Sequence, residues 1–437
     1  MNKRIAIVGA GWAGCAAAVE GVSAGCHVTL FEASHIPGGR ARKTLVEGMA
    51  VDNGQHILLG AYRQTLRLMR QVGIDTRQAF LNLPLQMRYP PFPAVMDFVT
   101  PRWPAPFHLV AGLLKAKGLD REDRLALARF FACCRAIRWD IGEDRPVIRL
   151  LEQFRQTPKL YALLWRPLCL AALNTSPEQA SASVFLAVLR DSLGRKRTDS
   201  DMLVPVTDLS ALFPEKALAY CIARKGVVRL GETVRHIAFD GKGWVIDRAE
   251  GTRFDAVILA TPAAVARSLI SDIGDASPLA ALEFEPITTC YLKYPSSVRL
   301  ERPFYALLDY PEKKQWGQFV FDRGHFIRNQ EGLLAVVISV SSVVDNGDKT
   351  GLAAGIARQL AESFGNPELE KPLWSRVMTE KRATFRCTPG LVRPDCLFDR
   401  RGLLLAGDYV AGEYPATLES AVSSGVSAIK VLSELQR

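Results

Sequence analysis

Several features that define other protein classes are missing from this 437-residue sequence. No run of about 18 apolar residues is present, so the sequence predicts no membrane-spanning helix. The 33 glycines and 25 prolines are too few for a low-complexity or collagen-like chain. The nine cysteines form no C-x-x-C pair and no zinc-type spacing with histidine, so we expect neither disulfides nor a metal site. These features predict a globular protein of a reducing, cytoplasmic compartment.

The chain is basic, but its charge is not arranged for nucleic acid. Lys and Arg total 55 and Asp and Glu total 45, which gives a formal net charge of +10. The basic residues are scattered, and Arg195–Arg197 is the one tight run. A nucleic-acid groove needs a basic stripe interleaved with aromatic residues, so we expect no nucleic-acid partner. Two interpretations stay open, a solvated basic surface and a face that contacts an anionic membrane.

The N-terminal segment has the pattern of a dinucleotide-binding unit. Ile5–Val8 predicts a buried strand, the G-x-G-x-x-G turn Gly9–Gly14 follows, and a helix of small residues is expected from Ala13 to Ser23. A second strand, His27–Phe31, leads to Glu32, which lies where an acid that binds ribose is expected. The glycines let backbone approach a pyrophosphate, and the helix N-terminus supplies N–H groups for it. A secretory signal would explain the apolar start but not the acid after the second strand.

Further turns indicate a cofactor larger than NAD. Ile36–Arg40 is a second glycine turn that ends in an arginine, as expected where a diphosphate is held from two sides. Val51–His56 is a third turn, rich in hydrogen-bonding groups. Near the other end, a predicted strand at Gly402–Ala406 leads into Gly407-Asp408 and then a helix that begins near Pro415. The dipole of that helix can stabilise negative charge on a reduced ring.

The middle of the chain predicts a helical region and a second sheet. Residues 66–203 look helical with proline-rich breaks, the longest of which is 84–106. Within this region, the apolar patch Trp103–Leu114 is either a cap that faces the core or an entrance that dips into a membrane. Further strands are expected at 227–230, 234–239, 244–248, 254–260, 289–294, 318–321 and 333–343. One further helix is expected at 352–364.

Together these motifs resemble the FAD-binding framework of the flavin amine oxidase and phytoene desaturase superfamily. The resemblance implies an α/β fold with a Rossmann-like (GR2-type) FAD-binding domain and an inserted α+β substrate domain. Residues 1–65, 220–275 and 395–437 would form the discontinuous FAD-binding domain. Residues 66–219 and 276–394 would form the substrate domain, with a mostly helical cap and a mixed sheet.

The same resemblance implies which residues hold FAD. The first glycine turn would line the pyrophosphate, Glu32 would bind the adenosine ribose, and Arg40 would lie beside the phosphates and ribityl chain. The backbone of Val234 would meet the adenine, and that of Thr417 and Leu418 the flavin pyrimidine edge. The full expected set is Gly9, Ala10, Gly11, Trp12, Ala13, Gly14, Glu32, Ala33, Gly39, Arg40, Gly54, Gln55, His56, Val234, Gly407, Asp408, Thr417 and Leu418.

Three central segments, Val51–Tyr62, Trp165–Asn174 and Asp201–Pro205, are similar to the bacterial hydroxysqualene dehydroxylase family of squalene and hopanoid synthesis. This similarity implies that hydroxysqualene loses its hydroxyl as water and takes hydride from N5 of reduced FAD to give squalene. The alternatives are a polyprenoid desaturase, an amine or porphyrinogen oxidase, and a prenyl-lipid carrier without redox activity. The expected partners are a hydrophobic isoprenoid, an electron donor that the sequence does not identify, other enzymes of squalene synthesis, and the inner face of the cytoplasmic membrane.

A dehydroxylation also needs an acid near the leaving oxygen. The candidates are His56, Tyr409, Glu413 and Tyr414, because they flank motifs expected at the flavin. Each of these residues could instead have a structural role without catalysis. His56 could hydrogen-bond the backbone of a tight turn, the two tyrosines could wall the ring, and Glu413 could be exposed to solvent.

Overall fold

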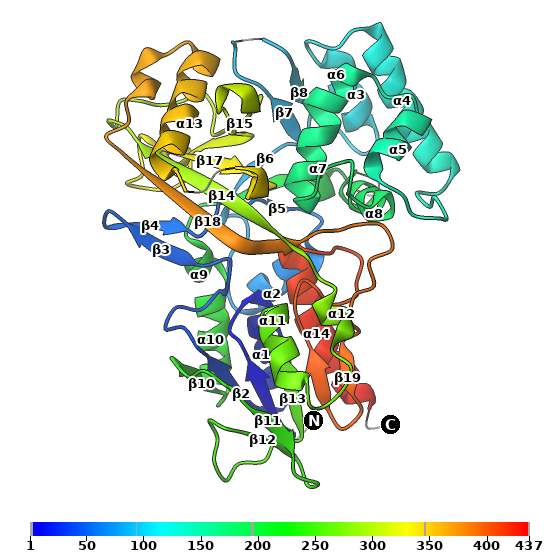
Figure 1. The fold of residues 1–437 in the computed structure, drawn as a ribbon, viewed down its shortest axis with the longest axis vertical. Coiled ribbons are helices and arrows are strands. Elements are labelled where there is room, and N and C mark those ends of the chain that lie inside the picture. Colours follow the sequence, from blue (N-terminus) through cyan, green and yellow to red (C-terminus); the bar gives the residue numbers. More distant parts are fainter. Residues whose placement is uncertain (1–2, 93, 194–195, 345–346, 436–437) are drawn as a thin grey trace.

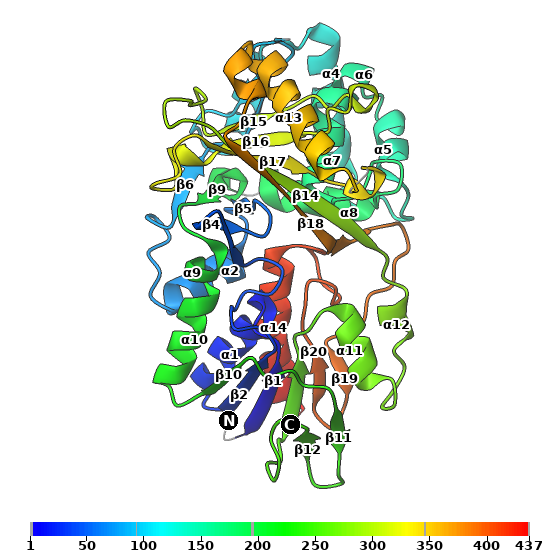
Figure 2. The same ribbon diagram turned by 60° about the vertical axis from the view of Figure 1, so that its left-hand side comes forward.

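The chain folds into two lobes, and the segments near both of its ends lie in the lower one (Figure 1; Figure 2). The computed structural model describes residues 3–92, 94–193, 196–344 and 347–435. Two long strands, β14 (Phe284–Lys293) and β18 (Trp374–Phe385), pair with each other and run along the junction between the lobes. Arg195 of the predicted basic run lies outside the described residues.

The lower lobe is built on a six-stranded sheet with the order β10-β2-β1-β13-β20-β19. The first five strands are parallel and β19 is antiparallel, so the predicted Rossmann-like sheet is present. In sheet order the strands are Val227–Leu230, His27–Glu32, Arg4–Val8, Ala256–Leu259, Leu403–Leu405 and Leu397–Asp399.

Alternating residues of β1 show how the sheet is covered on both faces. Ile5 and Ile7 belong to a core with helices α1 (Trp12–Ser23), α10 (Pro214–Ala223) and α14 (Leu418–Glu434). Ala6 and Val8 face the other core, which includes the hairpin β11–β12 and helix α11. These elements span Ile237–Phe239, Trp244–Ile246 and Ala263–Ile270, and α12 (Ser277–Ala280) follows. The domain boundary predicted at residue 220 falls inside α10.

The upper lobe contains a five-stranded antiparallel sheet with the order β15-β16-β17-β14-β18. The expected strands are present as parts of β14, β16 (Phe319–Asp322) and β17 (Leu333–Ile338). β17 ends early because Val340 has a φ of +51° and a 3₁₀ turn follows it. Sequence reasoning missed β15 (Phe304–Ala306) and β18, since β18 is rich in charged residues and has no apolar run. Helix α13 (Lys349–Phe364) covers one face of this sheet.

The segment 66–203 is only partly helical. Its helices are α2 (Arg63–Gln71), α3 (Phe107–Lys115), α4 (Arg121–Ala136), α5 (Val147–Gln153), α6 (Pro158–Leu160), α7 (Arg166–Leu173) and α8 (Ala182–Leu193). Short strands interrupt them where prolines prevent helix formation. These are β6 (Phe80–Leu83), β7 (Gln86–Arg88) and β8 (Asp97–Val99), while β9 (Met202–Pro205) pairs with both β6 and β5 (Leu58–Leu59). Among the remaining short elements are β3 (Lys43–Val46), β4 (Met49–Asp52), α9 (Leu209–Leu212) and a π-helical turn at Tyr161–Trp165.

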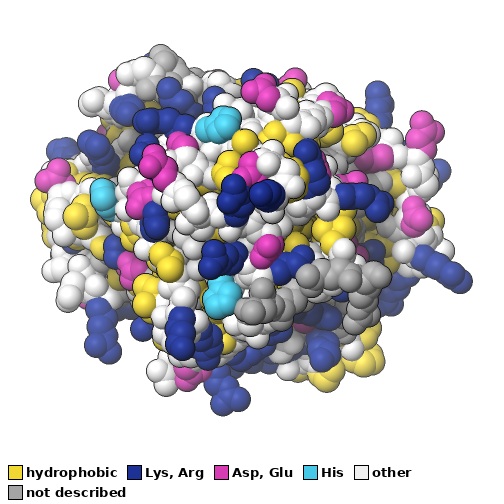
Figure 3. Space-filling model, turned by 90° about the horizontal axis from the view of Figure 1, so that it is seen from below, with side chains coloured by type: hydrophobic (Ala, Val, Ile, Leu, Met, Phe, Trp, Pro, Cys, Tyr) yellow, Lys and Arg dark blue, Asp and Glu magenta, His cyan; other side chains and the backbone are white. Residues whose placement is uncertain are grey.

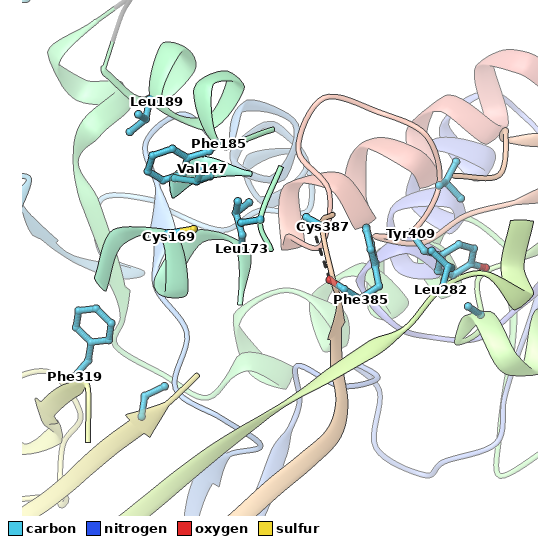
Figure 4. Packing of buried hydrophobic residues seen from close by; sticks show 14 of the residues in the cluster. Val147, Cys169, Leu173, Phe185, Leu189, Leu282, Phe319, Phe385, Cys387 and Tyr409 are labelled. Atoms are coloured by element: carbon cyan, nitrogen blue, oxygen red, sulfur yellow. Dashed lines mark hydrogen bonds between the residues drawn. The ribbon is translucent and has the colours of Figure 1, made fainter. Parts of the chain in front are cut away.

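One apolar core connects the upper helices to the junction between the lobes (Figure 4). Phe185 and Leu189 of α8 pack in the same cluster as Leu173 of α7, and the cluster continues to Phe385 and Tyr409. A C-terminal motif of the lower lobe therefore shares its core with the helical cap of the upper lobe.

Candidate functional site

The first glycine turn brings the backbone of β1 and α1 very close to β13. Gly9 has a φ of +105°, and a Cβ added there would lie 2.5 Å from the carbonyl oxygen of Ala260. A Cβ on Gly14 would lie 1.8 Å from the oxygen of Gly9, so both positions need glycine. Within the described residues, no side chain caps the start of α1, and its first turn holds no acidic residue. Its N–H groups are therefore available to an anion.

The second glycine turn packs directly on the first. Gly11 pairs with Gly38 as in a parallel sheet, and a Cβ on Gly39 would lie 3.2 Å from the Cα of Gly11. The indole N–H of Trp12 donates to the oxygen of Ala41 at 3.1 Å, which ties the two turns together. The glycines of the two turns thus bring their backbones together in one cradle, as a bound diphosphate requires.

Glu32 lies at the end of β2, beside this cradle. Its carboxylate accepts hydrogen bonds from the backbone N–H of Ala10 at 2.6 Å and of Ser34 at 2.8 Å. A carboxylate has about four acceptor positions, so Glu32 can brace the turn and still accept ribose hydroxyls. Val234 is buried in the loop between β10 and β11, whereas the side chain of Ala33 is exposed.

The structure joins the N-terminal and C-terminal motifs through one ion pair. Arg40 Nη2 lies 2.5 Å from Asp408 Oδ1, and Arg40 Nη1 donates to the oxygen of Ala383 at 2.6 Å. Asp408 is buried and follows Gly407, whose N–H donates to the Ser424 hydroxyl at 2.8 Å. Arg40 and Asp408, which are more than 360 residues apart in the sequence, are thus in direct contact.

A turn with positive φ precedes helix α14. Ala416 has a φ of +59°, and the Thr417 hydroxyl accepts from the Ser420 N–H at 3.0 Å, which caps the helix. Sequence reasoning missed Glu419, one residue beyond the expected contact Leu418. Its carboxylate accepts from the N–H groups of Gln64 and Thr65 at 2.8 and 2.9 Å, so α14 caps the N-terminus of α2. Burial raises the pKa of Glu419.

The third turn lies against the middle of β14, where a Cβ on Gly54 would be 3.9 Å from Thr289 Oγ1 and 3.7 Å from the His56 ring. His56 Nδ1 lies 2.8 Å from the oxygen of Gly54, and this contact requires a proton on Nδ1. The other ring nitrogen, Nε2, makes no hydrogen bond among the described residues. Burial of the ring lowers the pKa of His56, and the charge of Arg40 acts in the same direction. His56 is therefore mostly neutral at pH 7, with a bare Nε2 that can hold or release a proton.

A buried ion pair supports the same turn from the upper lobe, and sequence reasoning missed it. Arg323, fully buried after β16, donates to Gln55 Oε1 at 2.5 Å and lies 3.6 Å from Asp52 Oδ2. Its Nε donates to Gln330 Oε1 at 2.6 Å. Burial raises the pKa of Asp52 to about 6, and the positive charge of Arg323 opposes this rise. A lone arginine in a charged sequence gives no signal that it is buried.

The remaining acid candidates lie on one loop but in different surroundings. The hydroxyl of Tyr409 is buried and donates to the oxygen of Thr261 at 3.2 Å. The hydroxyl of Tyr414 donates to Asp191 of α8, and burial and this carboxylate raise the pKa of Tyr414. Glu413 is exposed to solvent. The catalytic roles of these residues and of His56 stay predictions.

The arrangement fits FAD. The glycines of the two turns leave open space that side chains would fill, and Glu32 lies beside them, where its carboxylate would accept ribose hydroxyls. At the end of β13, the Thr261 hydroxyl is buried and has no hydrogen-bond partner in the described part of the chain. A buried hydroxyl without a partner costs free energy unless a ligand satisfies it. Residues of the first turn would hold the diphosphate, and Thr417 and Leu418 would meet the ring through their backbone.

Comparison with known proteins agrees with this fit. The sequence matches the family described as flavin containing amine oxidoreductase over residues 12–430. The chain therefore belongs to this family and is an FAD-dependent oxidoreductase, which confirms the expected cofactor and the Rossmann-like α/β fold class.

Individual proteins similar to this chain include enzymes that act on isoprenoids and an amine oxidase. The hydroxysqualene dehydroxylase of Sinorhizobium fredii is 28% identical over 442 residues, which cover 97% of each chain. A probable zeta-carotene desaturase of Synechococcus elongatus is 24% identical over 486 residues and 99% of each chain. Among solved structures, cyclohexylamine oxidase from Brevibacterium oxydans shares the fold with a TM-score of 0.72, at 16% identity and over 100% of both chains.

Two further features are missing from the part of the chain that the structure describes. No helix in the described ranges combines the length and apolar character needed to cross a bilayer. Among residues 3–92, 94–193, 196–344 and 347–435, no group of three or more His, Cys, Asp or Glu side chains is arranged to hold a metal ion.

Proposed function

We propose that this protein reduces hydroxysqualene to squalene in squalene and hopanoid synthesis. The observation that carries the proposal is the similarity to a hydroxysqualene dehydroxylase along nearly the whole of both chains. In the net reaction the C–O bond of the alcohol breaks, a C–H bond forms at the allylic system, and one proton leaves with the hydroxyl as water. Reduced FAD, when bound, supplies the hydride.

The His56 turn lies on an apolar face of the upper sheet, because Tyr291 of that face donates to the oxygen of Asp52 at 2.8 Å. On the face of the upper sheet opposite α13, Phe304 stacks on Phe319 with ring centroids 5.7 Å apart, and Phe321 lies 5.0 Å from Phe304. The helices α7 and α8 add further apolar side chains to this core (Figure 4). A cation that forms in apolar surroundings is protected from water, which would otherwise add to it.

His56 is the proton donor that this geometry favours. The bond from Nδ1 to Gly54 fixes the ring orientation, so a protonated ring can donate only through Nε2. A lowered pKa makes protonated His56 a stronger acid, although the protonated fraction at pH 7 is smaller. The rate should therefore fall as pH rises through the pKa of His56, below 6.5.

The test is an anaerobic single turnover. The purified protein is reduced with dithionite, hydroxysqualene is added, and flavin absorbance is followed while lipid is extracted. Flavin re-oxidation with stoichiometric squalene supports the proposal. His56→Asn should slow re-oxidation and remove its pH dependence, whereas Glu250→Gln, at an exposed position outside the candidate site, serves as the control.

A desaturase is the second candidate, and the similarity to a zeta-carotene desaturase favours it. In that reaction hydride would leave a carotenoid substrate instead of entering it. Flavin that stays reduced with hydroxysqualene, together with oxidised enzyme that becomes reduced by phytoene or zeta-carotene, would replace our proposal with this one.

A further inference from the structure

Helix α3 carries an apolar ridge on its outer side. Phe107, Val110 and Leu114 follow helical spacing along one face and are 63%, 53% and 66% exposed. Trp103, just before the helix, is 51% exposed. These four residues are called the α3 patch below. The helix lies in the upper lobe, away from the glycine turns (Figure 1).

The exposure is not a result of loose packing. The opposite face of α3 is buried through His108, Ala111 and Gly112. A Cβ on Gly112 would lie 3.1 Å from the Phe98 ring, so the helix is pressed against β8. The inner face of α3 packs on the core, whereas Phe107, Val110 and Leu114 point outward, so the core of this chain does not cover them.

The charges within residues 100–119, which carry the α3 patch, are all positive, and the acidic residues Asp120 and Glu122 follow beyond them. Residues 100–119 contain Arg102, Lys115 and Lys117 and no Asp or Glu. All three basic side chains are exposed, and Lys115 Nζ lies 5.4 Å from the centroid of the Trp103 ring. On the face seen in Figure 3, by contrast, Lys and Arg are interspersed with Asp and Glu.

We propose that the α3 patch docks the protein on an anionic lipid bilayer. A helix lying in the interface buries its large apolar side chains among the acyl chains, while flanking Lys and Arg meet anionic headgroups. A tryptophan is well placed at that boundary because its ring is both apolar and polar. The inference rests on the surface alone and does not depend on the proposed substrate.

The test is co-sedimentation of the flavin-loaded protein with vesicles of phosphatidylcholine, with and without phosphatidylglycerol. We expect binding to the anionic vesicles that weakens as salt is added. Phe107→Ser with Leu114→Ser should lower the affinity at least about tenfold, because two large side chains no longer leave water. Lys115→Gln and Lys117→Gln should each lower binding to anionic vesicles about fivefold.

The matched control is Leu45→Ser with Ile222→Ser, which changes two apolar side chains of similar exposure in the lower lobe. This variant should bind like the wild type, and flavin content shows that each variant is folded. Absence of wild-type binding, or equal binding by both double variants, would overturn the proposal. So would a loss of self-association in the Phe107/Leu114 variant with unchanged vesicle binding, because the patch would then contact a second copy of the chain.

Discussion

Replacing Arg323 by methionine should destabilise the protein by about 2.7 kcal/mol more at pH 8 than at pH 5. The pKa of Asp52 is about 6, above its ordinary value of 3.8, so the folded protein holds this proton more tightly than the unfolded chain. The favourable contribution of the protonated carboxyl is complete below pH 3.8 and is lost as pH rises through 6. Arg323 limits that loss by pairing with the ionised carboxylate. Without Arg323, Asp52 should keep its proton to higher pH.

The magnitude follows from the distance and the pKa. At 3.6 Å and an effective dielectric constant of about 20, the two charges attract by about 4–5 kcal/mol. That energy would raise the pKa of Asp52 by about three units at about 1.4 kcal/mol per unit. Because the carboxyl can take up a proton, the pH-dependent loss is limited to about 2.7 kcal/mol at pH 8. At pH 5 this pH-dependent part of the loss should be close to zero. The substitution also leaves the side-chain oxygens of Gln55 and Gln330 without their donor. Each unpaired oxygen adds about 1–3 kcal/mol to the destabilisation at every pH.

The assay is urea unfolding of the flavin-loaded protein, followed by tryptophan fluorescence at pH 5 and pH 8. In an Asp52→Asn background, Arg323→Met should cost the same free energy of unfolding at both pH values. Arg63→Met is the matched control, because Arg63 is half-exposed and pairs with Asp199 at 3.1 Å. Its cost should stay below about 1 kcal/mol. An equal loss at pH 5 and pH 8 for Arg323→Met would refute the reasoning.

Two further predictions concern the cofactor site, and a third concerns the cap of α2. Glu32→Ala should weaken FAD retention by roughly 1.5–3 kcal/mol, measured as flavin released on dilution, and unchanged retention would argue against its ribose role. Gly9→Ala should abolish flavin binding, because its methyl would meet the oxygen of Ala260 at 2.5 Å; Gly241→Ala, with a φ of +87° and nothing within 4 Å, should retain flavin. Glu419→Gln should lower the free energy of unfolding by about 1–3 kcal/mol in urea, since an amide presents only one acceptor atom to the N-terminus of α2. The exposed Glu434→Gln is its control, and equal stability of the two would contradict the capping role.

Sequence reasoning succeeded where a feature depends on neighbouring residues. The turn Gly9–Gly14 with its flanking strands and Glu32 lies within some thirty residues, and the conformation of Gly9 excludes other side chains. The strands of the parallel sheet are short apolar runs that can be recognised without knowing their partners. β18 was missed because it pairs along one side only and keeps many charged residues on its exposed face.

The sequence by itself determined the cofactor class, because the glycine turns and the acid at the end of β2 act through local backbone geometry. Tertiary structure alone decided which distant polar groups meet. Arg40 meets Asp408, Arg323 meets Asp52, and Glu419 caps α2. It also decided that the ridge of α3 faces outward, since an apolar helix face has the same pattern whether a core or a membrane covers it. Burial and long-range pairing depend on the whole chain, and no local pattern encodes them.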